Sequence, residues 1–224
     1  YAREVVADPL AGCGLHGVLA ARGEAFDGIL NGVDARTWDP SRDRHLPARY
    51  HVQDLVGKSV CRARLLADAE LEDHRRPLLG VVGRLVPQKG IDLVCDQLDR
   101  LVAGDFSLIV LGTGEAALEE QLAAASARHP GRVAFVPEFS EAWAHRIYAG
   151  CDLFLMPSRF EPCGLGQLYA LRYGTIPVVR RTGGLADTVV DADALHLAEG
   201  KATGLVFDAP TTEALGGGIA RGLA

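Results

Sequence analysis

The chain has 224 residues, of which 48% are apolar and 23% charged, and its formal net charge is −6. This length suits one domain of about 150 residues with further segments, and the ordinary charged fraction argues against a disordered chain. The acidic balance and the lack of a basic run exclude duplex nucleic acid as the expected partner. An anionic ligand would have to be held by a local site.

Five cysteines, an odd number, form no Cys-x-x-Cys pair. This argues against a disulfide framework or a zinc site and favours a reducing, cytoplasmic location. No apolar run reaches the ~18 residues of a membrane span, and the first residues do not resemble a signal peptide. Because the sequence begins at Tyr1 without a Met, we expect a fragment of a longer protein.

The first third of the sequence is irregular. Residues before 78 are rich in Gly, Pro and Asp, with turn signals at Asn31-Gly32 and Asp39-Pro40. The clearest helical pattern there covers residues 54–66. This part predicts a connecting segment with flanking helices.

From residue 78 the pattern becomes regular, as short apolar runs alternate with amphipathic stretches of helical length. In one such stretch Ile91, Val94 and Leu98 recur at helical spacing. Strands alternating with helices predict a parallel sheet covered on both faces, an α/β doubly wound, Rossmann-like fold. The expected strands are residues 78–82, 107–111, 133–136, 153–156, 176–179 and 204–207.

In such a fold, ligands bind beyond the carboxyl ends of the strands. After the first expected strand, Arg84 and Lys89 flank a turn into a helix, although the chain has only three lysines. Fixed cations together with the N–H groups of a helix N-terminus suit a diphosphate. The alternative is a solvated Arg and Lys in a surface loop.

After the second expected strand, Gly112 and Gly114 form a tight turn. The Gly-x-Gly-x-x-Gly spacing of a dinucleotide site is not completed. The turn can admit a ligand, but most such turns are structural.

After the fourth expected strand, Glu161 stands in a turn before a helix that we expect to start near Cys163. The N–H groups of Gly164, Leu165 and Gly166 would then face an anion. Glu161 can hold sugar hydroxyls or stabilise an oxocarbenium-like transition state. Its alternative is an acid that only complements the helix dipole. Cys163 as a nucleophile is disfavoured, since no His stands nearby in sequence.

After the fifth expected strand, Arg180 and Arg181 precede a Thr-Gly-Gly turn. They predict a second phosphate-binding or loop-anchoring element. The alternative is a turn whose arginines pair with surface acids.

Two sequence patterns contain residue types that bind metals, but neither is interpreted as a metal site. Asp191-Ala192-Asp193 resembles the Asp-x-Asp motif of some glycosyltransferases, but it lies in a polar stretch and is interpreted as a solvated loop. His145 lies four residues after Glu141, and one His with one Glu makes no metal site. No metal and no other cofactor is therefore expected.

Taken in order, these stretches resemble bacterial glycogen synthases and plant starch synthases over nearly the whole chain. The stretches that carry the resemblance are residues 31–34 with Trp38, 83–90, 145–147, 158–165, 167–174 and 180–189.

The resemblance implies the GT-B architecture, in which two Rossmann-like domains face a cleft and the C-terminal one binds the nucleotide of ADP-glucose. The family's N-terminal Lys-Thr-Gly-Gly-Leu motif and catalytic His are absent, so a C-terminal piece is expected. Residues 1–30 would be the tail of the N-terminal domain, 31–77 the interdomain connection and flanking helices, and 78–224 the nucleotide-sugar-binding domain.

By the same resemblance, Arg84, Lys89 and Glu161 are the catalytic residues. Arg84 and Lys89 would hold the diphosphate and stabilise the leaving ADP, while Glu161 would face the donor glucose. The implied substrate-binding residues are Asn31, Gly112, Gly114, Phe139, Cys163, Gly164, Leu165, Gly166 and Gln167.

Two of these residues depart from the family pattern. Phe139 stands where an aromatic, usually Tyr, stacks on adenine, and stacking needs only the ring face. Gly166 stands where the family usually has Thr, which removes a hydroxyl near the phosphates but keeps the backbone donor.

The expected function is the retaining transfer of glucose from ADP-glucose to the non-reducing 4-OH of an α-1,4-glucan, with cations in place of a metal. A nicotinamide-dependent oxidoreductase would need a glycine fingerprint after the first strand, where the sequence has Gly83-Arg84-Leu85. A sugar-nucleotide-binding module without activity of its own is the remaining alternative. The sequence predicts no membrane or nucleic-acid partner and no particular oligomeric state.

Overall fold

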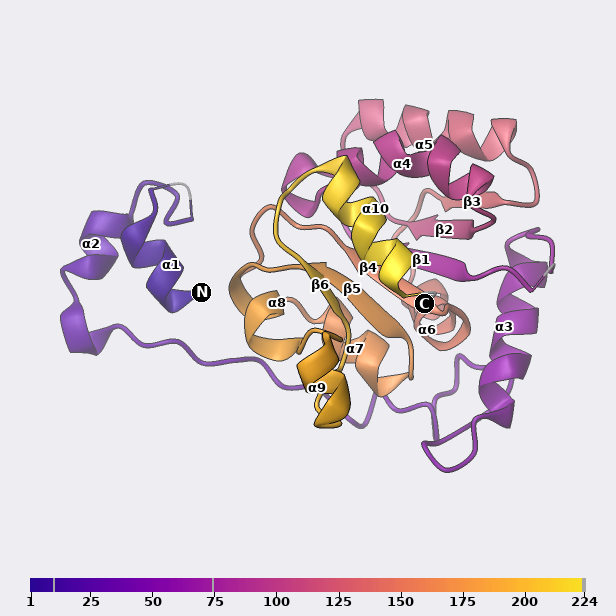
Figure 1. Cartoon of the computed structure of the whole chain (residues 1–224), viewed down its shortest axis with the longest axis horizontal. Coiled ribbons are helices and arrows are strands. Elements are labelled where there is room, and N and C mark those ends of the chain that lie inside the picture. Colours follow the sequence, from indigo (N-terminus) through magenta and orange to yellow (C-terminus); the bar gives the residue numbers. More distant parts are fainter. Residues whose placement is uncertain (10, 74, 223–224) are drawn as a thin grey trace.

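The expected apolar runs form a six-stranded parallel sheet with strand order β3-β2-β1-β4-β5-β6 (Figure 1). The computed structural model describes residues 1–9, 11–73 and 75–222. The doubly wound α/β fold is confirmed, and the strand bounds differ from the prediction only at the ends of β5 and β6. The strands are β1 Leu78–Val82, β2 Ser107–Leu111, β3 Val133–Val136, β4 Leu153–Met156, β5 Ile176–Arg180 and β6 Leu205–Phe207.

Helices connect the strands and precede the sheet. The helix predicted at residues 54–66 begins at Val56 and ends at Asp68, and the Asp54 carboxylate accepts from the Val56 N–H at 3.0 Å. The helices are α1 Ala2–Ala7, α2 His16–Ala20, α3 Val56–Asp68, α4 Ile91–Ala103, α5 Ala116–Arg128, α6 Glu141–Gly150, α7 Gly166–Arg172, α8 Gly183–Thr188, α9 Ala194–Ala198 and α10 Thr212–Arg221, with 3₁₀ turns at Gly23–Ala25 and Pro87–Lys89.

Both faces of the sheet are buried, which is why its strands read as unbroken apolar runs. On one face, Leu79 and Leu108 share a core with residues of α4, α5 and α10. On the other, Ile109 and Phe154 share a core with residues of α3, α6 and α7.

Part of the expected interdomain connection belongs to this second core. Tyr50, Cys61 and Leu65 are buried in it, and the Tyr50 hydroxyl donates to the Tyr173 carbonyl at 2.8 Å. Helix α3 therefore covers the sheet, and the packed unit starts before Leu78.

Lys58 on α3 is a buried cation within this contact. Its ammonium donates to the carbonyls of Ala149 and Tyr173 at 3.0 and 3.2 Å and to Thr175 Oγ1 at 2.8 Å. Burial lowers the pKa of Lys58 to about 8.

The first residues form a separate small helical pair, α1 and α2, beside the sheet and joined to it by a long irregular segment (Figure 1). Helix α1 contacts the start of α8, because Glu4 Oε1 accepts from the Gly183 N–H at 2.9 Å. Within the described residues, every helix is too short or too polar to cross a membrane.

Candidate functional site

The loops that follow β1 and β4 meet at the centre of the sheet. These strands are neighbours, and the connections leave them in opposite directions, which makes the crevice above them the ligand position of a doubly wound sheet. The Arg159 N–H donates to the Gln88 carbonyl at 2.8 Å, and Gln88 Nε2 donates to the Phe160 carbonyl at 2.7 Å. The two loops therefore form one unit.

Gly90 permits this approach. Its φ is 69°, and a Cβ at this position would lie 2.1 Å from the carbonyl oxygen of Pro157. Both the left-handed backbone and the contact require glycine here.

The three residues predicted to be catalytic lie in these two loops. Lys89 Nζ lies 2.5 Å from Glu161 Oε2, and Ser158 Oγ donates to the same oxygen at 3.1 Å. Glu161 is 5% exposed. Arg84 is exposed, and its side chain has no hydrogen-bond or ion-pair partner among the described residues. The two loops thus carry a paired cation and carboxylate and, on the loop after β1, an exposed cation without a partner among the described residues.

Arg159 fixes the loops to the start of α4. Its guanidinium contacts both oxygens of Asp92, at 2.7 and 2.6 Å, and also donates to the Pro87 carbonyl at 2.5 Å. The hydrogen bonds from Arg159 lower the pKa of the Asp92 carboxyl. Sequence reasoning gave Arg159 no role, because its partner lies 67 residues away and no local spacing signals it.

The glycine turn after β2 lies against the loop after β1. A Cβ on Gly112 would lie 1.9 Å from the Gly83 carbonyl oxygen, and one on Gly114 would lie 2.1 Å from that of Leu85. The missing side chains make room for neighbouring backbone. These glycines thus shape the loop that carries Arg84.

The helix expected to start near Cys163 starts later, so that prediction was wrong. Helix α7 begins at Gly166, because Gly164 has a left-handed φ of 69° that ends any helical turn before it. Within the described part of the chain, the N–H groups of Gly164, Leu165 and Gly166 donate to no acceptor. They remain three successive free donors beside Glu161.

The side chain of Gln167 fixes the loop before α7 by hydrogen bonds to its backbone. It is fully buried, and its Nε2 donates to the carbonyls of Cys163 and Gly164 at 3.1 and 3.0 Å and to Thr188 Oγ1 at 3.0 Å. These contacts fit a positioning residue. Cys163 is partly exposed, with its carbonyl engaged by Gln167.

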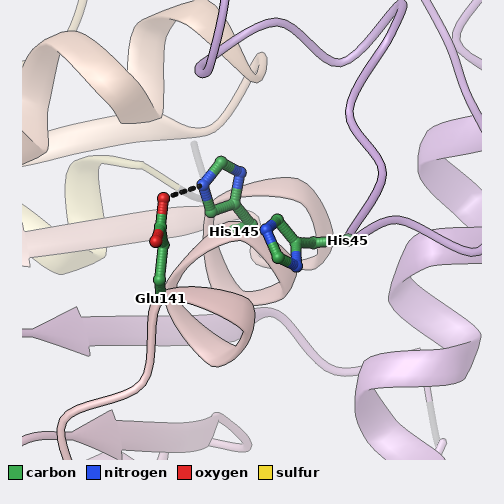
Figure 2. A group of neighbouring side chains, drawn as sticks. All are labelled: His45, Glu141 and His145. Atoms are coloured by element: carbon green, nitrogen blue, oxygen red, sulfur yellow. Dashed lines mark ion pairs between the residues drawn. The ribbon is translucent and has the colours of Figure 1, made fainter.

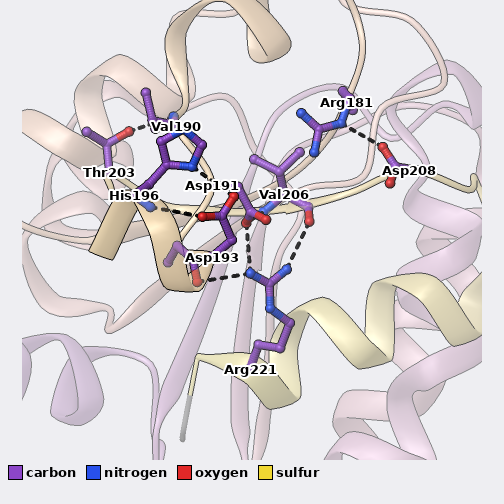
Figure 3. Close-up of polar contacts among 10 residues, drawn as sticks. Arg181, Val190, Asp191, Asp193, His196, Thr203, Val206, Asp208 and Arg221 are labelled. Atoms are coloured by element: carbon purple, nitrogen blue, oxygen red, sulfur yellow. Dashed lines mark hydrogen bonds and ion pairs between the residues drawn. The ribbon is translucent and has the colours of Figure 1, made fainter. Parts of the chain in front are cut away.

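The stretch after β5 anchors the same loop. Arg180 Nε donates to the Ser158 carbonyl at 2.7 Å, and a Cβ on Gly183 would lie 2.1 Å from the Glu161 carbonyl oxygen. Arg181 instead pairs with Asp208 at 2.7 Å (Figure 3). Arg180 therefore anchors the loop, as one interpretation of this stretch predicted. Arg181 pairs with a surface acid, as the alternative predicted.

The Asp-x-Asp stretch is structural. Asp191 Oδ1 accepts from the Val206 N–H at 2.8 Å and from Arg221 at 2.9 Å (Figure 3). Asp193 caps α9 by accepting from the His196 N–H at 2.9 Å. Reading this stretch as a solvated loop was wrong for Asp191, whose side chain is 14% exposed.

Two predicted substrate-binding residues lie outside the paired loops. Phe139 is 98% exposed and stands between β3 and α6. Asn31 is exposed in the irregular segment between α2 and α3. Neither side chain is held by the fold in a way that explains its residue type.

The sequence model of the family described as "Glycosyl transferases group 1" matches residues 64–224. The chain belongs to this family. The match takes in all six strands and every loop of the crevice.

Within this family, the chain is similar to proteins named glycogen synthase. The chain is 53% identical over 226 residues to a protein named glycogen synthase from Thioalkalivibrio sulfidiphilus, covering 100% of this chain and 47% of that protein. It is 50% identical to a glycogen synthase from Anaeromyxobacter dehalogenans, covering 96% and 44%. The chain thus spans about half the length of the curated relatives it matches.

A solved structure agrees with both the family and the fold. It is the catalytic domain of starch synthase IV from Arabidopsis thaliana bound to ADP and acarbose, with 35% identity and a TM-score of 0.92. The match covers 99% of this chain and 46% of that one.

Proposed function

We propose that this chain is the nucleotide-sugar-binding part of a glycogen synthase that transfers glucose from ADP-glucose to the non-reducing 4-OH of an α-1,4-glucan, with retention. The glycogen synthase relatives and the starch synthase bound to ADP and acarbose support this assignment. The observation that carries it is the crevice between β1 and β4. There the Lys89–Glu161 pair joins the two loops, Arg84 lies on the loop after β1, and the free N–H donors follow Glu161 on the loop after β4.

The proposed division of the chain follows the sequence expectation with one adjustment. Residues 1–30 are proposed to be the end of an N-terminal domain, and residues 78–224 the donor-binding domain. The intervening connection includes α3, which packs on the donor-binding sheet. The five free thiols support the proposed cytoplasmic location.

Arg84 and Lys89 are proposed to hold the donor diphosphate. A departing diphosphate gains negative charge as the glycosidic bond breaks, and fixed cations stabilise it in the role a metal often takes. The N–H groups of Gly164, Leu165 and Gly166 would add hydrogen bonds to phosphate or sugar oxygens.

Glu161 is proposed to face the donor glucose. Its carboxylate can accept from sugar hydroxyls and favour positive charge at the anomeric carbon. Because Lys89 pairs with the same carboxylate, its ammonium can be shared between Glu161 and the diphosphate. The shared ammonium would couple the negative charge on the departing diphosphate to the positive charge that develops on the sugar.

Retention is proposed to come from attack on the face that the leaving group departs from. The acceptor 4-oxygen forms the new bond to the anomeric carbon as the bond to the phosphate oxygen breaks. The bonding electrons leave with ADP, and the acceptor proton passes to a phosphate oxygen.

The adenine and the remaining donor contacts are assigned to exposed residues. The open ring face of Phe139 suits stacking on a base. Asn31 is proposed to reach the donor from the connecting segment. Gly112, Gly114 and Gln167 act by shaping the loops that meet the donor, and Cys163 by its backbone.

Glucan synthesis by the full-length protein tests the function. We expect incorporation of glucose from ADP-glucose into glycogen, with much lower incorporation from UDP-glucose, and tighter binding of ADP than of UDP to the chain alone. Binding of ADP without synthesis by the full-length protein would favour the alternative, a sugar-nucleotide-binding module. Failure of both would overturn the assignment.

A further inference from the structure

A cluster of metal-ligating side chains lies outside the donor crevice (Figure 2). Glu141 and His145 stand one turn apart on α6, and His45 comes from the irregular segment before α3. One ligand atom from each of these residues lies within 4.8 Å of the other two. The sequence placed only Glu141 and His145 together, because His45 is 100 residues away from His145.

The ring of His145 is fixed in orientation. It is fully buried and stacks on Trp38, with ring centroids 3.9 Å apart and planes at 6°. Its Nδ1 lies 2.6 Å from Asp43 Oδ2, which also accepts from the Tyr173 hydroxyl at 2.5 Å. Because a carboxylate oxygen accepts, Nδ1 carries a hydrogen, and in the neutral ring Nε2 then presents a lone pair.

That Nε2 is a buried polar atom without a hydrogen-bond partner in the described chain. The Glu141 carboxylate oxygen nearest to it is 3.7 Å away, too far for a hydrogen bond (Figure 2). A lone pair facing a carboxylate is unfavourable unless a positive charge lies between them.

We propose that His45, Glu141 and His145 bind a divalent transition-metal ion of the zinc type. Two imidazoles and one carboxylate, with water as a fourth ligand, form a known zinc ligand set. Asp43 acts on Nδ1 as the carboxylate that orients a ligating histidine. The site lies apart from the crevice loops, and the proposal does not depend on the proposed function.

The three ligand atoms need to move only slightly closer together to bind a zinc ion. Ligand atoms in a tetrahedral zinc site are ~3.3 Å apart for bonds of about 2.0–2.1 Å. The Glu141 side chain is 57% exposed and free to turn inward, whereas His145 is fixed. Asp43 and Glu141 bring two negative charges, and the adjacent Arg146 is paired with Asp68 at 3.3 Å. A divalent cation would balance the two carboxylates.

The bound ion would join the segment before α3 to α6. Among the described residues, side-chain contacts already tie these two parts together, from Arg146 Nε to the His45 carbonyl at 3.5 Å and from His145 to Asp43 at 2.6 Å, so the ion would add to an existing contact. The expected consequence is stabilisation of this contact by metal, because an ion that binds only the folded chain raises its stability.

Cobalt(II) titration of the full chain tests the site, because tetrahedral Co²⁺ has an intense visible spectrum. We expect one equivalent to bind without sulfur-to-cobalt charge-transfer bands. His45→Asn and Glu141→Gln should each weaken binding by about tenfold or more. His129→Asn is the matched control, since His129 pairs with Asp99 at 3.0 Å elsewhere on the surface. The control should bind cobalt like the unaltered chain.

A second measurement separates metal binding from folding. Zinc should raise the melting temperature of the unaltered chain and of His129→Asn, but not that of His45→Asn. In the absence of metal, His45→Asn should melt close to the unaltered chain. Binding that survives both ligand substitutions, sulfur-to-cobalt bands, or no stoichiometric binding would overturn the proposal.

Discussion

Lys89 Nζ lies 2.5 Å from Glu161 Oε2, although the two residues are 72 positions apart in the sequence. The pair joins the loop after β1 to the loop after β4. A group proposed to hold the diphosphate and one proposed to face the sugar are therefore in direct contact, and substitutions at the two should not act independently.

Removal of one partner should cost more stability than removal of both. Lys89→Met leaves the Glu161 carboxylate buried at 5% exposure without its cation, a loss of about 1–3 kcal/mol in the free energy of unfolding. Adding Glu161→Gln should recover part of it, with a coupling energy of roughly 1 kcal/mol or more. Urea unfolding of the four proteins measures this coupling.

The exposed pair Lys201 and Glu199, 2.9 Å apart, provides the matched cycle. Its coupling energy should be small, about 0–1 kcal/mol. Equal coupling in the two cycles would contradict the role of burial.

Arg84 should contribute to ADP affinity but not to stability. Its side chain is exposed and unpaired among the described residues, so Arg84→Ala removes no internal contact. Charge-assisted phosphate contacts are worth roughly 1.5–3 kcal/mol, which predicts a loss of about tenfold or more in ADP affinity. Calorimetry should show this loss for Arg84→Ala and none for the control Arg100→Ala. Equal affinities would remove Arg84 from the site.

Glu161→Gln should lower kcat while leaving ADP binding nearly intact. The amide keeps the size of the side chain but loses the charge proposed to act as ADP departs. We expect kcat of the full-length enzyme to fall by about a hundredfold or more. Loss of the Lys89 contact lowers stability in either case, but if Glu161 only pairs with Lys89 and complements the dipole of α7, kcat would stay normal. Steady-state kinetics and a melting curve on one variant distinguish these outcomes.

Gly112→Ala should disturb both fold and donor binding. Its Cβ would lie 1.9 Å from the Gly83 carbonyl oxygen, so the loop that carries Arg84 must move. We expect a stability loss of about 1–3 kcal/mol and weaker ADP binding. Gly217→Ala in α10, where a Cβ has open space, should be neutral or stabilising by about 0.5–1 kcal/mol. A neutral Gly112→Ala would show that the loops adapt freely.

Lys58 should make stability depend on pH in the alkaline range. Its pKa is about 8 in the folded chain against 10.5 for the free side chain, so between these values the unfolded chain binds more protons. The Lys58 contribution to the free energy of unfolding therefore rises with pH across this window. Relative to Lys58→Met, the unaltered chain should gain up to about 3 kcal/mol from pH 8 to 10.5.

The comparison with Lys58→Met cancels the titration of cysteines and tyrosines, which both proteins share. Lys201→Met, which removes an exposed lysine, should leave the pH profile unchanged. A constant difference between the unaltered chain and Lys58→Met across the window would show that Lys58 titrates normally.

The sequence by itself determined the sheet and the position of its ligand loops. Strands buried on both faces are almost continuously apolar. The strands Leu78–Val82 and Ser107–Leu111 could therefore be predicted from the sequence alone. Parallel strands bring their carboxyl ends to one edge, which placed the loop of Arg84 and Lys89 beside the loop of Glu161. The start of α7 could not be predicted this way, because no apolar pattern signals that Gly164 takes a left-handed φ of 69° just before the helix.

Only the tertiary structure decided which distant side chains meet. The contacts of Arg159 with Asp92, of Lys89 with Glu161, and of His45 with His145 join residues between 67 and 100 positions apart. Local patterns carry the periodicity of a helix or strand, since that follows from backbone geometry. They carry no trace of a pairing between two loops, since the pairing depends on how the sheet brings those loops together.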